Sequence, residues 1–201
     1  MGRKSMRWLL IIGMISLFTV PVHPVFAQRF DRSHSTDFMI QVDAFDSESE
    51  TGSNPLRVEA DDTLLFGIAY GYTWEGGKLN VNGNLLFGQQ ELETTEQDVG
   101  DPFTRKMDMD VTVFDLNLDY YLLNRRLTPM ATAGFGIVSY GDFGDVSISE
   151  GDLSVNAGLG LRWDFADTAF IKATYRYRYT ELEDTDYVGF DGPSIALGLR
   201  F

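Results

Sequence analysis

Apolar residues recur at every second position along much of this chain. In the stretch 152–165 they are Leu153, Val155, Ala157, Leu159, Leu161, Trp163 and Phe165, separated by polar residues and glycines. An α-helix repeats every 3.6 residues, so one helical face cannot produce this division, whereas successive side chains of a β-strand point to opposite sides. The same period occurs in eight segments, 37–45, 63–74, 78–90, 111–122, 127–140, 152–165, 170–180 and 193–201. The sequence therefore predicts eight β-strands.

Alternation is equally typical of a water-soluble sandwich or lipocalin, so the face that turns inward must be decided separately. In each segment the polar residues occupy alternate positions, called the polar parity below, and these positions also carry many glycines. They are Gly67, Gly71, Gly88, Gly134, Gly136, Gly158, Gly160 and Gly198. On a solvated outer face a glycine weakens the strand and packs nothing. Inside a narrow barrel it leaves room for long side chains, so we expect the polar face inside and the apolar face outside.

The connections between the segments differ in length in a regular way. Three are short ("EGG", "NRR" and "ADTA"), and the alternate connections are long and rich in acidic residues. Short turns at one end and long loops at the other are typical of bacterial outer-membrane barrels. We therefore predict an all-β fold, an eight-stranded antiparallel up-and-down transmembrane β-barrel in the outer membrane of a Gram-negative bacterium. Its termini and turns would be periplasmic and its long loops extracellular.

The first residues resemble a secretory signal. Arg3, Lys4 and Arg7 precede an apolar run that is too short for a stop-transfer helix, and small residues precede a cleavage point after Ala27. We predict a cleaved signal peptide at 1–27, a short periplasmic lead-in at 28–36 and a barrel domain at 37–201. The chain has no cysteine, so the exported domain would fold without disulfides.

Together, the signal, the eight segments, "LTPMATAGFGIVSYG" and the closing "PSIALGLRF" resemble the small outer-membrane barrels of the OmpA/OmpX type. In that family the last strand, with apolar residues at alternate positions and a terminal Phe, is read by the barrel-assembly machinery. The resemblance implies this role for Ile195, Leu197, Leu199 and Phe201. It is specific for architecture and assigns no activity.

Charged residues on the inward parity are the most informative polar positions. They are Asp43, Asp115, Asp119, Arg162, Asp164, Lys172, Arg176, Arg178 and Arg200. Buried charges must pair or be hydrated, and the lumen of an eight-stranded barrel is just wide enough for side chains to fill it. We expect Asp43 and Asp115 to pair with Arg176 and Arg178 in a network that plugs the lumen. The alternative is a gate that rearranges to pass ions.

Aromatic residues gather near the ends of the outward parity. The set comprises Trp74, Phe87, Tyr120, Trp163, Phe165, Tyr177 and Tyr179. Because aromatic side chains favour the two membrane–water interfaces, we expect them to form two girdles.

The long loops are dominated by Asp and Glu, in keeping with a formal net charge of −14 that makes nucleic acid an implausible partner. A solvated, self-repelling rim is one reading of these loops. The alternative is that Asp108, Asp110, Asp184 and Asp186 collect divalent cations and through them bridge lipopolysaccharide, although they match no defined calcium loop.

Candidates for catalysis are scarce. The only histidines are His23, inside the predicted signal, and His34, just before the first strand. We therefore expect no enzyme activity and no cofactor. The expected function is a structural or surface-interaction barrel, monomeric because a closed sheet has no free edge. A narrow porin-like or lateral-exit channel for small molecules or ions is the alternative, and a lipid-modifying enzyme is a third.

Overall fold

In the computed structural model, the described residues are 29–49, 56–60, 63–74, 76–96, 103–141, 151–182 and 185–201. Within these ranges, the side chains of 47–49, 56–60, 91–96, 103–109, 181–182 and 185–188 are not described. The predicted signal peptide, residues 1–27, lies outside the described residues.

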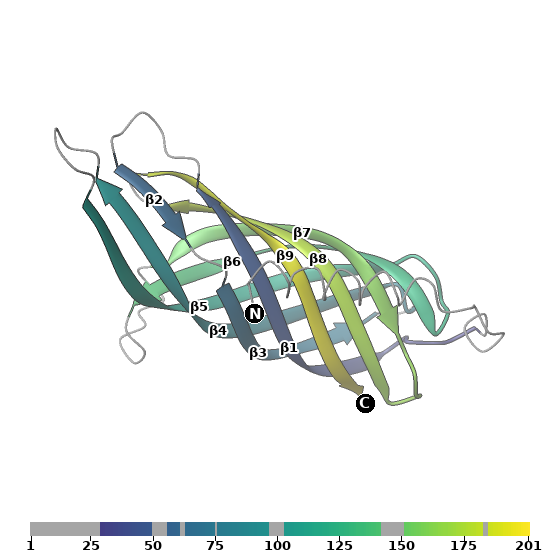
Figure 1. Ribbon diagram of the computed structural model, residues 1–201. Helices are drawn as coiled ribbons and strands as arrows, with labels where there is room; N and C mark the ends of the chain where they lie inside the picture. The colour runs from purple at the N-terminus through teal and green to yellow at the C-terminus, as the bar shows by residue number, and fades with distance from the viewer. Residues whose placement is uncertain are drawn as a thin grey trace.

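The described chain is a single closed β-sheet (Figure 1). Its strands are β1 (Ser35–Ser49), β2 (Leu56–Ala60), β3 (Thr63–Thr73), β4 (Leu79–Glu96), β5 (Phe103–Tyr121), β6 (Leu127–Gly141), β7 (Asp152–Trp163), β8 (Ala169–Leu182) and β9 (Thr185–Arg200). Every pairing is antiparallel, β9 returns to pair with β1, and the pairing of β4 with β5 closes the wall. Among the described residues, no helix is long and apolar enough to cross a membrane.

Short β2 does not add a ninth position to the wall. It pairs with the part of β4 that extends beyond β3, so β2 and β3 together occupy one position. The barrel therefore has eight positions, and the predicted eight-stranded up-and-down fold is confirmed. Two ends can be distinguished. The turn end holds the β3–β4, β5–β6 and β7–β8 connections and the last residue, Phe201, whose backbone bonds in both directions with Thr36. The loop end is the opposite one.

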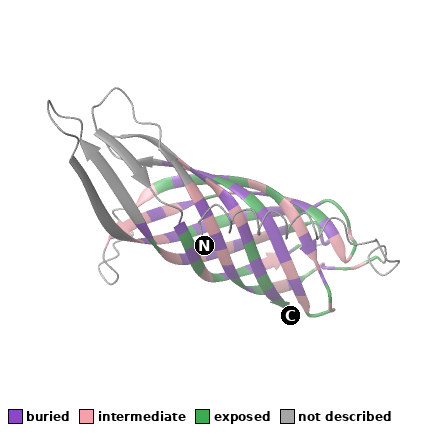
Figure 2. Ribbon diagram, viewed as in Figure 1, coloured by how far each residue is buried: buried purple, intermediate pink, exposed green. Residues whose placement is uncertain are grey.

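Burial alternates along each strand (Figure 2). In β5, for example, Asp115, Asn117 and Asp119 are buried, while Leu116 and Leu118 between them are exposed. Leu159 on β7 is 71% exposed, although it is a leucine in the middle of a strand. The polar parity therefore lines the interior, and the apolar parity forms the outer surface.

Several strands are longer than the sequence predicted. Residues 91–110 were expected to be a loop, yet β4 continues to Glu96 and β5 begins at Phe103, with the two paired throughout. Likewise β9 begins at Thr185, before the expected 193. The prediction relied on apolar alternation, which marks only the part of a strand that touches lipid. Beyond the lipid the backbone still pairs, but its side chains need no apolar face.

The interior is less uniformly polar than expected. One apolar cluster lies toward the turn end and consists of Met39, Ala69, Phe170 and Ala196. A larger apolar collar lies toward the loop end and consists of Phe45, Leu65, Leu86, Val111, Val113, Val138 and Phe190. Side chains that fill a lumen can bury apolar area against one another, so the inward parity need not be polar at every level.

Glycine at position 198 is required by the packing of the turn-end cluster. A Cβ built on Gly198 would lie 2.2 Å from the ring of Phe170, which fills the lumen at this level. We expect Gly198→Ala to lower the free energy of unfolding by about 1–3 kcal/mol, the usual effect of overpacking. Gly141→Ala is the control, because a Cβ there meets nothing within 4 Å. Equal stability of the two variants in urea titrations would contradict this packing.

Candidate functional site

The charged interior is the candidate site, and it begins at the turn end with Arg162 of β7. This guanidinium is completely buried and donates to Asp37 at 2.6 Å, to the Tyr121 hydroxyl at 2.8 Å and to Asp164 at 3.2 Å. It also lies 3.6 Å from the centroid of the Phe170 ring. Its charge is therefore compensated by two carboxylates and by contact with aromatic rings.

Asp164, which directly follows β7, connects the charged groups at this end of the lumen. Besides the bond from Arg162, it accepts from Arg32 Nε at 2.8 Å and Nη2 at 2.5 Å, and it also accepts from Arg200. One fully buried carboxylate thus serves three guanidinium groups. Arg32, Asp37, Tyr121, Arg162, Asp164 and Arg200 fill the lumen at the turn end and are called the turn-end cluster below.

Arg32 reaches this cluster from the lead-in, the segment 29–34 before β1. It also donates to the carbonyl oxygens of Leu123 and Arg125, which lie in the β5–β6 turn across the barrel. Phe30 of the same segment lies 4.8 Å from the guanidinium of Arg200. The lead-in therefore extends across the turn end of the lumen and is held there by buried contacts.

Three members of the turn-end cluster, Arg32, Asp37 and Tyr121, were missed by the sequence analysis. Tyr121 carries no charge, so a search for inward charges passes over it. Asp37 is the first residue of the predicted segment 37–45 and has the same parity as Asp43, so a complete count of inward charges in this segment would have found it. Arg32 precedes every alternating segment, and no periodicity marks it. Its role depends on where the lead-in crosses the barrel, which is tertiary information.

The middle of the lumen carries three more cations and three carboxylates. Lys172 Nζ lies 2.5 Å from Asp119, which also accepts from Asn82 at 3.0 Å. Arg178 donates to Asp115. Arg176 Nη1 is 4.0 Å from Asp43, at the limit of an ion pair. Asp43, Asp115, Arg176 and Arg178 were expected to form one network, and the structure places all four at this level of the lumen.

Many polar atoms at this level have no hydrogen-bond partner among the described residues. Both side-chain amide atoms of Asn84, Asn117 and Asn156 are in this group, and so are Nε and Nη1 of Arg176. Buried polar groups usually find a partner in protein or water. The middle of the lumen is therefore its most polar and least internally satisfied level.

The apolar collar lies above this level and surrounds a small cavity. Six collar residues, Phe45 and Phe190 among them, line the cavity together with polar neighbours that include Gln90 and Arg178. Arg178 links the two levels, since its guanidinium also lies 5.4 Å from the Phe45 ring.

Comparison with known proteins identifies the family of this barrel. Residues 14–201 match the family model of the outer membrane protein beta-barrel domain. The chain belongs to this family. The fold resembles the outer membrane protein OprG from Pseudomonas aeruginosa, with a TM-score of 0.57 and 12% identity over 86% of this chain and 98% of that chain. It also resembles Neisserial surface protein A, with a TM-score of 0.60 and 14% identity over 83% and 97% of the two chains. No curated protein matches the sequence.

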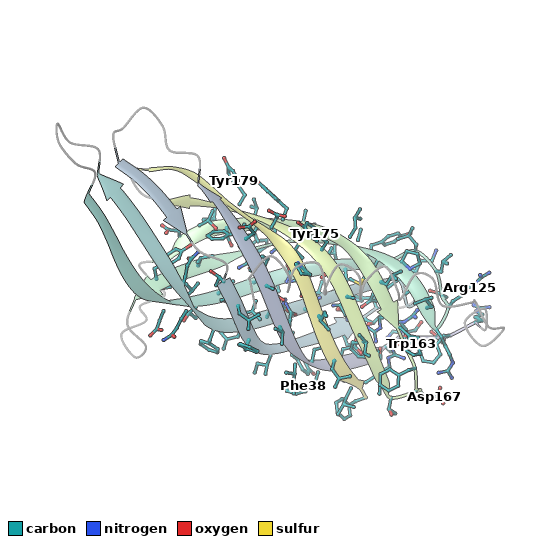
Figure 3. All side chains as sticks on the ribbon, in the orientation of Figure 1. Phe38, Arg125, Trp163, Asp167, Tyr175 and Tyr179 are labelled. Atoms are coloured by element: carbon teal, nitrogen blue, oxygen red, sulfur yellow. The ribbon has the colours of Figure 1, made fainter. Side chains whose placement is uncertain are left out.

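As an outer-membrane β-barrel of a Gram-negative bacterium, the chain presents its apolar parity to lipid. The predicted girdle residues all lie on this outward parity. Trp74, Tyr120, Phe165 and Tyr177 are exposed, and Phe87, Trp163 and Tyr179 are half-buried. Figure 3 shows Trp163 toward the turn end and Tyr179 toward the loop end of the wall. The interfacial role of these aromatic residues stays a prediction.

The remaining sequence candidates are less well placed for a site. Ile195, Leu197, Leu199 and Phe201 form an exposed outward row along β9. Of the four acidic candidates, Asp184 and the side chains of Asp108 and Asp186 lie outside the described residues, and Asp110 accepts from Gln89 at 3.0 Å. His34, which is exposed, contacts the hydroxyl of half-buried Tyr72 at 2.9 Å.

Proposed function

We propose that this protein is a non-enzymatic barrel with a plugged lumen, whose wall and loops perform a structural or surface-interaction role. The observation that carries the proposal is the stacking of three closed levels in one narrow interior. The turn-end cluster, the mid-lumen ion pairs and the apolar collar each consist of buried side chains. Filling of this kind is what an eight-stranded barrel allows, and it leaves no continuous aqueous path.

The proposed orientation has the turns and both termini in the periplasm and the acidic loops outside the cell. The unequal length of the connections supports it, since bacterial barrels have short periplasmic turns and long extracellular loops. In this orientation the loops would meet lipopolysaccharide, with divalent cations bridging Asp and Glu to phosphate. We propose the outward row Ile195, Leu197, Leu199 and Phe201 as the signal for the assembly machinery, and a monomer as the functional form.

Conductance of the purified barrel in planar bilayers tests the plugged lumen. We expect no stable, discrete openings of the size that an aqueous pore gives. Regular openings at moderate voltage would contradict the proposal and favour a channel.

A narrow channel is the second candidate, and one observation favours it. The middle of the lumen holds polar atoms without hydrogen-bond partners, which are suited to binding water or ions. They belong to the side chains of Asn84, Asn117, Asn156 and Arg176. This polar level nevertheless lies between two levels of buried side chains, the turn-end cluster and the apolar collar. For this reason we favour the plug.

A further inference from the structure

Three exposed cations lie on neighbouring segments of the turn end, and none belongs to the turn-end cluster. Arg29 of the lead-in forms a backbone bridge with Arg125 in the β5–β6 turn. The neighbouring β3–β4 turn is tied to the same place, because the Asn124 side chain donates to the Gly76 carbonyl at 2.9 Å. Lys78 is also fixed there by its carbonyl, which accepts from the Tyr121 amide at 2.7 Å. We call Arg29, Lys78 and Arg125 the basic patch.

The positive charge of the basic patch is only partly balanced by the described residues. None of its three side chains has an ion-pair partner among the described residues, whereas the adjacent Arg126 pairs with Asp167 at 2.6 Å. Asp31 offers a partial balance. Hydrogen bonds from Ser33, and then the charge of Arg29, hold the pKa of this exposed carboxyl below its ordinary value. Like charges on neighbouring segments repel one another, so an anion bound among them would relieve this repulsion.

The surface next to the basic patch is apolar. Leu79 directly follows Lys78 and is 40% exposed. It lies beside exposed Tyr120 on the neighbouring strand β5. Leu122 and Leu123, two positions before Arg125, are exposed as well. Figure 3 shows Arg125 at the turn end of the wall, where the apolar outer surface ends. Cations thus border the lipid-facing surface on the same two strands.

We propose that the basic patch binds the phosphate of an anionic phospholipid in the leaflet that surrounds the turn end. The acyl chains of this lipid lie along the apolar surface that begins at Leu79 and Tyr120. A free phosphate ion would use only the cations, whereas a phospholipid uses both the cations and the adjoining apolar wall, which is why a lipid fits the site better. Basic residues near an anionic membrane surface each strengthen association by about fivefold.

Retention of lipid by the folded full-length barrel tests the proposal. The protein in detergent micelles is mixed with phosphatidylglycerol or with zwitterionic phosphatidylcholine of the same acyl chains, and bound lipid is counted by native mass spectrometry. We expect the wild-type protein to retain phosphatidylglycerol in preference. The variant Lys78→Gln with Arg125→Gln should lose up to about 25-fold of this preference, the product of two fivefold effects.

Arg126→Gln is the matched control, because it removes one positive charge from the same turn but leaves the basic patch intact. It should retain phosphatidylglycerol as the wild type does. Equal retention of both lipids by the wild type, or an unchanged preference in the double variant, would overturn the proposal. A preference that inorganic phosphate abolishes would show that the site takes the ion alone, which would also overturn it. None of these outcomes changes the conductance of the barrel. The proposal of lipid binding and the proposal of a plugged lumen can therefore be refuted independently.

Discussion

Replacing Asp164 by Asn is expected to lower the free energy of unfolding of the barrel by about 3–5 kcal/mol. Asp164 accepts hydrogen bonds from Arg32, Arg162 and Arg200, and its side chain is fully buried. The amide keeps the shape of the carboxylate but removes its charge, so three guanidinium groups are left with Asp37 as the only carboxylate in the turn-end cluster. A buried cation without compensation is among the most costly groups in a folded protein.

Asp167→Asn is the control for this measurement. It lies in the same β7–β8 turn and pairs with Arg126, but its side chain is 81% exposed, so the loss should be below about 1 kcal/mol. Urea unfolding of the folded barrel in lipid vesicles, followed by tryptophan fluorescence, compares the two variants with the wild type. Similar stability of the two variants would show that Asp164 does not hold the turn-end cluster together.

Removing both Arg176 and Arg178 distinguishes a structural plug from a gate. The double alanine variant leaves buried Asp115 without its arginine partner, at a cost of about 3–5 kcal/mol. Asp43 loses the weaker contact with Arg176 and keeps the hydrogen bonds from Gln41, so we expect a smaller loss there. We expect a marked loss of stability and at most a small current in planar bilayers. The current stays small because the turn-end cluster and the apolar collar still close the lumen on either side.

The matched control removes two exposed arginines of the turn end, Arg29 and Arg125, by the same alanine substitutions. It should unfold close to the wild-type denaturant concentration and show no new current. A large conductance in the Arg176→Ala, Arg178→Ala variant together with unchanged stability would identify a gate and contradict the plug.

The wall of the barrel could be predicted from sequence because each strand that touches lipid must keep one apolar parity. A shift of β8 by one residue would turn Lys172, Arg176 and Arg178 toward lipid, at about 2–4 kcal/mol each near the midplane. The same constraint places the lumen charges on the inward side of their strands, including the four charged residues in the middle of the lumen. The side of the wall on which a residue lies can therefore be predicted from sequence wherever contact of a charged side chain with lipid would be costly.

Features that lipid does not constrain could not be predicted in this way. β4 and β5 continue past the apolar band, where only backbone pairing remains, and the sequence carries no alternation there. The apolar collar around Phe45 and Phe190 depends on which inward side chains meet across the lumen, which is a property of the closed barrel. Arg32 enters the turn-end cluster only because the lead-in crosses the turn end of the lumen.

The account depends above all on an apolar outer wall around a polar interior, and spin labels test this arrangement directly. Labels at Leu159 and Tyr177, which are 71% and 52% exposed, should be accessible to oxygen dissolved in lipid and shielded from a water-soluble nickel complex. Labels at buried Asn156 and Thr174, which neighbour them in sequence, should be shielded from lipid-dissolved oxygen. The opposite result, with Leu159 and Tyr177 in water and Asn156 and Thr174 in hydrocarbon, would contradict the account.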